Sequence, residues 1–283
     1  MTNNEPQAMT SNEPLAAASR PADLTRQIAV ISAMVFMIIG AMVGTGLFGG
    51  TAVQDLQGGA LDADASYLAP ARQAFSIWTA IYVGLVAYTI WQALPGQRAR
   101  DRQRAMGWWI ALTMVLNGLW LVIAQFGTLL LTVIAIVVLL VALCITFRMS
   151  VLTRVTGDGF FDSLLIDGVT GLHLGWVTLA TVANITAWLT TIGQPEWESA
   201  ATVWGVVVLI VVAILGLSIS WLSGWRIAPA LALAWGLTWL GFARLTGEPQ
   251  STAIGVTAMV VADLILIPTV IIAVLRLLRP SSD

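Results

Sequence analysis

Long apolar runs separated by short polar connections are the main pattern of this chain. About 20 mostly apolar residues are needed to cross the hydrocarbon core of a bilayer as a helix. Eight runs meet this requirement: 28–49, 72–94, 106–126, 128–148, 169–192, 200–222, 227–245 and 252–276. No run alternates apolar and polar residues as a membrane strand would, so the pattern predicts an all-α, polytopic membrane helix bundle with about eight transmembrane helices.

The segment before the first apolar run is polar and rich in Asn, Glu, Pro, Ser and Ala. Such a composition is typical of disorder, and residues 1–27 are predicted to form a disordered cytoplasmic tail. The first run begins only at Ile28. This late start is unlike a secretory signal, so the run is interpreted as a retained first span.

The distribution of arginine predicts the orientation of the bundle. With eight spans and the N-terminus inside, only Arg72 and Arg244 fall outside. The inner side then carries Arg20, Arg26, Arg98, Arg100, Arg102, Arg104, Arg148, Arg154, Arg226, Arg276 and Arg279. Because basic residues are retained on the cytoplasmic side, this asymmetry predicts a multi-pass protein of the cell (cytoplasmic) membrane with both termini cytoplasmic.

The charged residues narrow the classes of function. They make up 10% of the chain, against about 25% in a soluble domain. A net charge of −2 argues against nucleic acid as a partner, and the single Cys144 excludes an internal disulfide and a cysteine-based metal cluster. Asp158, Asp162 and Asp167 lie in one inside loop, where they could bind a cation, although solvated loop acids are commoner. We therefore expect no metal site.

Aromatic and polar residues recur at helical spacing on three of the predicted spans. Side chains three or four positions apart lie on one face of a helix, so each set forms a stripe. The stripes are Phe75, Trp78 and Tyr82; Asn117 and Trp120; and His173, Trp176, Ala180 and Asn184. Polar residues facing lipid are costly, so these stripes should face the bundle interior.

Two interpretations of the stripes stay open on spacing alone. Three facing stripes would build an aromatic-walled pocket with a few hydrogen-bonding groups, which suits a flat aromatic ligand. Alternatively, asparagine and threonine hold membrane helices together, and tryptophan is common at membrane interfaces. The second interpretation needs no ligand.

The sequence motifs that contain these residues resemble those of the tryptophan-rich sensory protein family, TspO/MBR, which is also called the translocator or peripheral benzodiazepine receptor family. Phe75, Trp78 and Tyr82 in FSIWTAIY match the pattern of its second helix. LNGLW at 116–120 matches its third helix, and GWVTLATVANITAW at 175–188 matches its fifth. The order and spacing agree across residues 28–192.

The resemblance implies a five-helix TspO-like domain over residues 28–192, with a tetrapyrrole or sterol pocket roofed by the first loop. It implies that Trp78 and Trp176 line the pocket, supported by Asn117, Trp120 and Asn184. Residues 185–198 lack the tyrosine and basic residue of the family's cholesterol pattern, which argues against a sterol. Residues 193–283 carry three additional transmembrane helices that the five-helix family lacks.

Two ionisable residues lie inside predicted spans. His173 could ligate haem iron, carry a proton, or serve as a hydrogen-bonded packing residue. Asp263 lies five residues before Pro268, where the pair could mark a proton or substrate path, or Asp263 could bond a neighbouring helix. Gly40 and Gly44 form a small-xxx-small face, a packing signal that could support a homodimer.

The sequence therefore predicts an integral membrane protein that binds a small, flat hydrophobic ligand of the porphyrin or haem type, for sensing or transport. It requires no cofactor, and its surroundings are the lipid bilayer. The alternatives are a proton-coupled secondary transporter that uses Asp263 and His173, a porphyrin-degrading membrane enzyme, and a scaffold without a small ligand. An enzyme is the less favoured reading.

Overall fold

Helices account for all the regular structure that the computed structural model describes, which covers residues 20–47, 51–155, 157–194, 197 and 199–278. Within these residues there is no β-strand, and eight helices are long and apolar enough to cross a membrane. The predicted all-α bundle of eight spans is therefore confirmed.

The long helices follow the predicted spans closely. A short 3-10 turn, Arg72–Ser76, leads into α2, and a π-helix, Asp162–Gly168, leads into α5. The helices are α1 (Pro21–Gly44), α2 (Ile77–Ala93), α3 (Asp101–Phe126), α4 (Leu129–Leu152), α5 (Val169–Ile192), α7 (Ala201–Leu222), α8 (Ile227–Thr246) and α9 (Thr252–Leu278).

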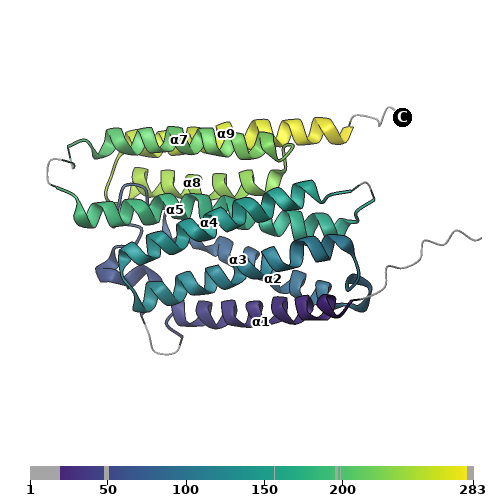
Figure 1. Cartoon of the computed structure of the whole chain (residues 1–283). Coiled ribbons are helices and arrows are strands. Elements are labelled where there is room, and N and C mark those ends of the chain that lie inside the picture. Colours follow the sequence, from purple (N-terminus) through teal and green to yellow (C-terminus); the bar gives the residue numbers. More distant parts are fainter. Residues whose placement is uncertain (1–19, 48–50, 156, 195–196, 198, 279–283) are drawn as a thin grey trace, which may run out of the picture.

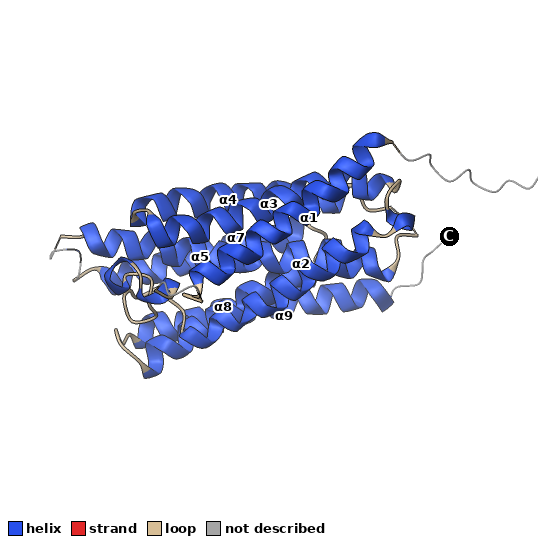
Figure 2. Ribbon diagram, turned by 90° about the horizontal axis from the view of Figure 1, so that it is seen from below, coloured by secondary structure: helices blue, strands red, loops and turns tan. Residues whose placement is uncertain are grey.

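The helices run side by side along one common direction. Figure 1 shows α1 at one edge of the bundle and the pair α7 and α9 at the other, with α8 and α5 between them. Figure 2 shows the same alignment from below, with the first turn of α1 and the last turn of α9 at one end. That arrangement agrees with an even number of spans.

The first helix begins earlier than predicted, so residues 21–27 are not a disordered tail. Pro21 occupies the first helical position, and the Asp23 side chain accepts a hydrogen bond from the backbone N–H of Arg20. Asp23 also accepts two hydrogen bonds from Arg104 on α3, both at 2.8 Å. These polar contacts extend the helix at its N-terminal end, before the apolar run begins. Hydrophobicity alone does not reveal this extension. Residues 1–19 lie outside the described residues.

Small residues set the closest helix contacts. A Cβ atom added at Gly40 of α1 would lie 3.0 Å from the carbonyl oxygen of Gly118 on α3. The small-xxx-small face of α1 is therefore used inside the chain and is not free to form a homodimer. In the same way, a Cβ at Gly175 of α5 would overlap the carbonyl oxygen of Pro229 on α8. This close approach brings the three C-terminal helices against the rest of the bundle.

The three acids between α4 and α5 are neither a cation site nor solvated loop acids. Arg102 of α3 reaches all three, with its closest contact to Asp167 at 2.5 Å. Arg226, just before α8, lies 2.6 Å from Asp167. The complete ion-pair network joins Arg100, Arg102, Arg154 and Arg226 to Asp158, Asp162 and Asp167. Arginine thus supplies the positive charge, and four segments are joined at one end of the bundle.

Replacing Arg102 by Ala should destabilise the bundle strongly. The Arg102 side chain is buried, and its removal leaves buried carboxylates without their main partner. Removing one partner of a buried ion pair lowers the free energy of unfolding by about 3–5 kcal/mol. Thermal unfolding in detergent measures the loss. The control is Arg148→Ala, because Arg148 is exposed and, among the described residues, donates only to the Leu222 carbonyl. Equal losses for both variants would contradict the structural role of the network.

Candidate functional site

A cavity lies at one end of the bundle beneath the loop between α1 and α2. Residues 51–71 of this loop, called the lid below, include two short 3-10 turns, Val53–Asp55 and Gln57–Gly59. The lid contributes Val53, Leu61 and Pro70 to the cavity wall, together with Ala60, Asp62, Ser66 and Ala69. The first loop therefore roofs the cavity, as the resemblance implied.

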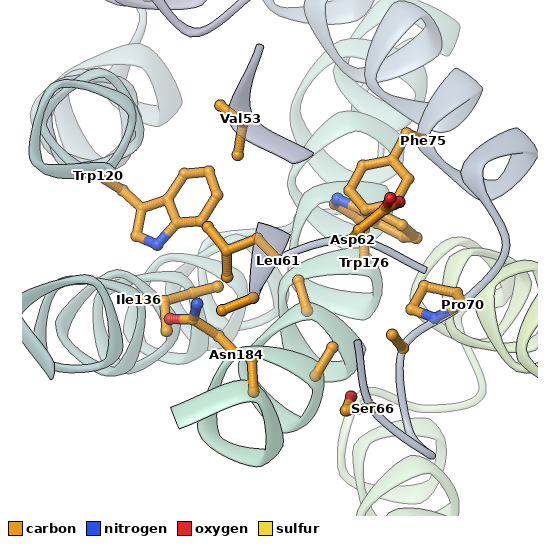
Figure 3. Close-up of a pocket in the computed structure, with 15 residues that line it drawn as sticks. Val53, Leu61, Asp62, Ser66, Pro70, Phe75, Trp120, Ile136, Trp176 and Asn184 are labelled. Carbon is orange, nitrogen blue, oxygen red and sulfur yellow. The ribbon is translucent and has the colours of Figure 1, made fainter. Parts of the chain in front are cut away.

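Four helical elements supply the rest of the cavity wall. α5 supplies Trp176, Ala180 and Asn184, with Ala183 and Ala187 on the same face. Phe75, Trp120 and Ile136 come from the turn before α2, from α3 and from α4. Atoms leave about 530 Å³ of space here, part of which is open to solvent. Figure 3 shows Trp120, Asn184 and Trp176 arranged around this space, with Leu61 of the lid between Trp120 and Asn184 in this view.

An aromatic cluster forms the base of the cavity. The Phe75 ring meets Trp176 edge to face, with ring centroids 5.5 Å apart. Behind them, Trp78 contacts Trp176 at 6.1 Å and stacks on Tyr82 at 5.2 Å. Edge-to-face and offset pairs at these separations are the favourable geometries for aromatic rings. The cluster therefore fixes the position of the Trp176 indole at the cavity wall.

Several polar atoms of the cavity wall are buried without a hydrogen-bond partner among the described residues. They are the indole N–H groups of Trp120 and Trp176 and both side-chain amide atoms of Asn184. The hydroxyl of Ser66 in the lid is in the same state. An unsatisfied buried donor or acceptor costs about 1–3 kcal/mol. The residues around this space thus carry hydrogen-bonding groups that the described residues leave unsatisfied.

The nine predicted ligand-binding residues fall into two layers. Phe75, Trp120, Trp176, Ala180 and Asn184 line the cavity. The other four, Trp78, Tyr82, Asn117 and His173, lie outside the lining residues. Both layers belong to one arrangement, since the three stripes do face one another.

The second layer supports the first. Asn117 lies 3.5 Å from the Tyr82 hydroxyl, to which its amide donates a weak hydrogen bond. His173 is 1% exposed and packs against the edge of Trp78 with centroids 5.8 Å apart. Its Nε2 atom has no hydrogen-bond partner among the described residues. These residues position the cavity wall and do not form its surface.

Asp263 is not part of this site. It is exposed on α9, whereas His173 is buried within the bundle. The structure therefore does not bring these two residues together, and the alternative of a proton-coupled transporter that uses both stays a prediction. The alternative of a hydrogen bond from Asp263 to a neighbouring helix also finds no support, because the described residues provide no such bond.

Sequence reasoning missed part of the wall. Ala183 and Ala187 continue the Trp176–Ala180–Asn184 face at helical spacing, and their small side chains leave room beside the helix. That signal was present in the sequence. Ile136 on α4 was not detectable, because nothing distinguishes it from the other aliphatic residues of a uniformly apolar helix.

The lid and the 3-10 turn that follows it are tied to α8 by three hydrogen bonds. Arg244, fully buried, donates to the carbonyl oxygen of Ala63 at 2.8 Å. The backbone N–H of Ala71 donates to the Trp239 carbonyl at 3.3 Å, and the Trp235 indole donates to the Ala74 carbonyl at 3.0 Å. The C-terminal helices therefore hold the lid over the cavity.

A known protein family matches most of the chain. The family model described as TSPO-like protein matches residues 26–271, so the chain belongs to the TSPO-like family. The match runs through α7 and α8 and into α9, and thus includes the three helices expected to be additional. No match was found among curated proteins or among solved structures. The chain is a polytopic membrane protein of the TspO kind.

Replacing Arg244 by Met should loosen the lid while the bundle stays folded. The substitution removes the donors to Ala63 and to the Pro249 carbonyl but keeps an apolar side chain of similar length. A hydrogen bond to a charged group contributes about 1.5–3 kcal/mol, so amide hydrogen exchange in the lid should rise roughly tenfold or more. Arg276→Met is the control, because Arg276 lies at the other end of α9 and, within the described part of the chain, donates only to the Gly224 carbonyl. Unchanged exchange in the lid would contradict the clamp.

Lid mobility should also depend on pH. Arg72 donates to both carboxylate oxygens of Asp62, at 2.9 and 2.5 Å, and this holds the pKa of Asp62 below its ordinary value. A lowered carboxyl pKa stabilises the folded lid above the unfolded pKa of about 4, and the contribution is lost as the pH falls through the folded pKa.

A nitroxide at exposed position 64, in an Asp64→Cys, Cys144→Ser chain, reports this mobility by electron paramagnetic resonance. The spectrum should be the broad one of an immobile label from pH 7 to about 5, and its lines should narrow as the label becomes mobile below about 4. Adding Arg72→Gln should give a mobile label already at neutral pH. A spectrum that does not change with pH in either chain would refute the role of the pair.

Proposed function

We propose that this protein binds a flat, hydrophobic ligand of the porphyrin or haem type in the cavity beneath the lid, and that it serves in sensing or transport. The observation that carries the proposal is the set of unpartnered polar atoms on Trp120, Trp176 and Asn184 around an otherwise apolar space. Membership of the TSPO-like family supports a membrane protein of this kind.

The chemistry of the wall favours a ligand with an apolar ring and hydrogen-bond acceptors at its edge. Two indole N–H groups and one carboxamide donate to carbonyl or carboxylate oxygens, and the carboxamide oxygen also accepts. Phe75, Trp120 and Trp176 provide aromatic surface for stacking or edge contacts. With the lid in this position the enclosed space is only about 50 Å³, so a ligand of porphyrin size requires the lid to move outward.

The protein side chains favour recognition of the ring over recognition of a metal at its centre. His173 does not line the cavity, and the described residues contain no group of three potential metal ligands. Trp78 packs on His173 beside the aromatic cluster. Haem would therefore be held by its macrocycle and propionates, as a metal-free porphyrin would be.

The position of the lid suggests how binding is communicated. A ligand that enters the cavity displaces Leu61, which lies on the segment that Arg244 holds at Ala63. Movement of this segment acts directly on α8 through Trp239 and Arg244. Occupancy of the cavity would thus change the packing of the C-terminal helices, which is the output that a sensor or transporter needs.

Replacing Trp176 by Phe should weaken porphyrin binding without unfolding the protein. Phenylalanine keeps an aromatic ring beside Phe75 but removes the N–H donor. Loss of one hydrogen bond predicts a Kd for protoporphyrin IX that is about three- to tenfold higher. Titration monitored by porphyrin absorbance measures it. Asn184→Leu should act in the same direction.

The matched control is Trp221→Phe, because Trp221 is 69% exposed at the end of α7, away from the cavity residues. It should bind as the unchanged chain does. Saturable binding that is equal in all four proteins would place the ligand elsewhere, and absence of saturable binding in the unchanged chain would refute the porphyrin proposal.

A further inference from the structure

The middle of α9 presents a carboxyl group to the surface of the bundle. Asp263 is the twelfth of the 27 residues of this helix. It lies on the side opposite to Ala258, Ala262 and Ile265, which are buried against the bundle, and it is exposed. An ionisable residue at this depth of a membrane is costly unless a polar group meets it. The described residues provide none, so a group from outside the described part of the chain is needed to meet Asp263.

Asp263 lies within a regular row of branched aliphatic residues. The row alternates steps of four and three positions, which is the heptad spacing of two helices that pack along a seam. Its members are Val256, Val260, Asp263, Ile267, Val270 and Val274. Five of the six are exposed, and Val270 is half-buried. Every position except 263 carries valine or isoleucine, residues that pack with little loss of side-chain freedom in helices.

A single polar residue in such a seam is the feature that fixes register. In helix pairs, one polar side chain among apolar seam positions selects the partner alignment in which it meets its counterpart. Asp263 is central in α9, so alignment at this residue also brings the full length of the seam into contact. The row and the carboxyl group therefore point to the same helix pairing.

The nature of the partner follows from the charges of the chain. The chain contains no lysine, and every arginine that the structure describes lies in a loop or in the first or last two turns of a helix. No cation of a second copy is therefore available at the depth of Asp263. A carboxyl group is self-complementary, since a protonated carboxyl donates to the oxygen of another. Two copies related by a two-fold axis bring identical residues together.

We propose that the outer face of α9 is a homodimer interface, in which a second copy packs α9 against α9 and the two Asp263 carboxyl groups share a hydrogen bond. α9 lies at the edge of the bundle beside α7 (Figures 1 and 2). In the apolar 18-residue stretch of α9, only 28% is buried inside the structure, whereas 78% is buried in the corresponding stretch of the span that contains α5. The face is thus free, whereas the glycine face of α1 is already occupied by α3. This proposal does not depend on the identity of the ligand.

Disulfide cross-linking of the full chain in lipid bilayers tests the proposal. Cys144 is first replaced by Ser, and a single cysteine is placed at Ile267 in the seam or at Val141 in the middle of α4. The two side chains are similarly exposed, at 53% and 54%, but lie on different helices. Oxidation of the Ile267→Cys chain should give a species of twice the mass, and the Val141→Cys chain should give little of it.

Substitution of Asp263 in the Ile267→Cys chain tests the hydrogen bond. An interhelical hydrogen bond in a membrane raises the association constant by a factor of a few to a few tens. Asp263→Leu should therefore lower the dimer association constant about 3- to 30-fold, measured in a dilution series. Asp263→Asn keeps a self-complementary polar group and should retain most of the dimer. Equal cross-linking at positions 267 and 141, its absence at 267, or a dimer unaffected by Asp263→Leu would each overturn the proposal. A protein that only pairs Asp263 with a different membrane protein would give no cross-linked species in the purified system.

Discussion

Shielding of α5 from lipid is the constraint on which the rest of the structure depends. This helix carries His173, Trp176 and Asn184 along one side, and a polar stripe of this kind is unfavourable in hydrocarbon. The bundle meets the constraint by surrounding the helix: α4 and α8 pack along it, and α2 and the lid cover the remaining side. The cavity arises where this cover is incomplete, between the polar face of α5 and the underside of the lid.

The same constraint explains the role of the three C-terminal helices. α8 approaches α5 closely at Gly175, and its residues Trp239 and Arg244 hold the lid. Leu68 of the lid and Leu179 of α5 belong to the apolar core formed by α7, α8 and α9. Packing thus crosses the boundary at residue 193, although the sequence suggested two separate parts. The C-terminal helices help to form the roof of the cavity and are more than an appendage to a five-helix domain.

Spans and stripes could be predicted because both follow from periodicity. The apolar runs determine where helices cross a bilayer, and the spacing of Trp78, Asn117 and Trp176 determines which faces meet. Other features depend on contacts between distant segments, which no local pattern contains. The pairing of Asp162 and Asp167 with Arg102 of α3 and with Arg226 before α8 is one case. The start of α1 at Pro21, stabilised by Arg104, is another.

The orientation of Asp263 shows that the energetic cost of exposing a carboxyl group to lipid does not by itself predict burial within the chain. A buried carboxyl was expected, because intramembrane charges usually face the bundle interior. The structure places it on the outer surface, and the same cost then favours a contact beyond the chain. Trp78 is a comparable case, since its place behind Trp176 depends on the rotation of α2, which helical spacing alone does not give.

A structure of the full chain with protoporphyrin IX bound in lipid, determined by electron cryo-microscopy, tests the central claim most directly. The account predicts planar density beneath the lid, within hydrogen-bonding distance of Trp176 Nε1 and the Asn184 amide, with Leu61 displaced. Density confined to the outer, lipid-facing surface of the bundle, with the cavity and the lid unchanged, would contradict it.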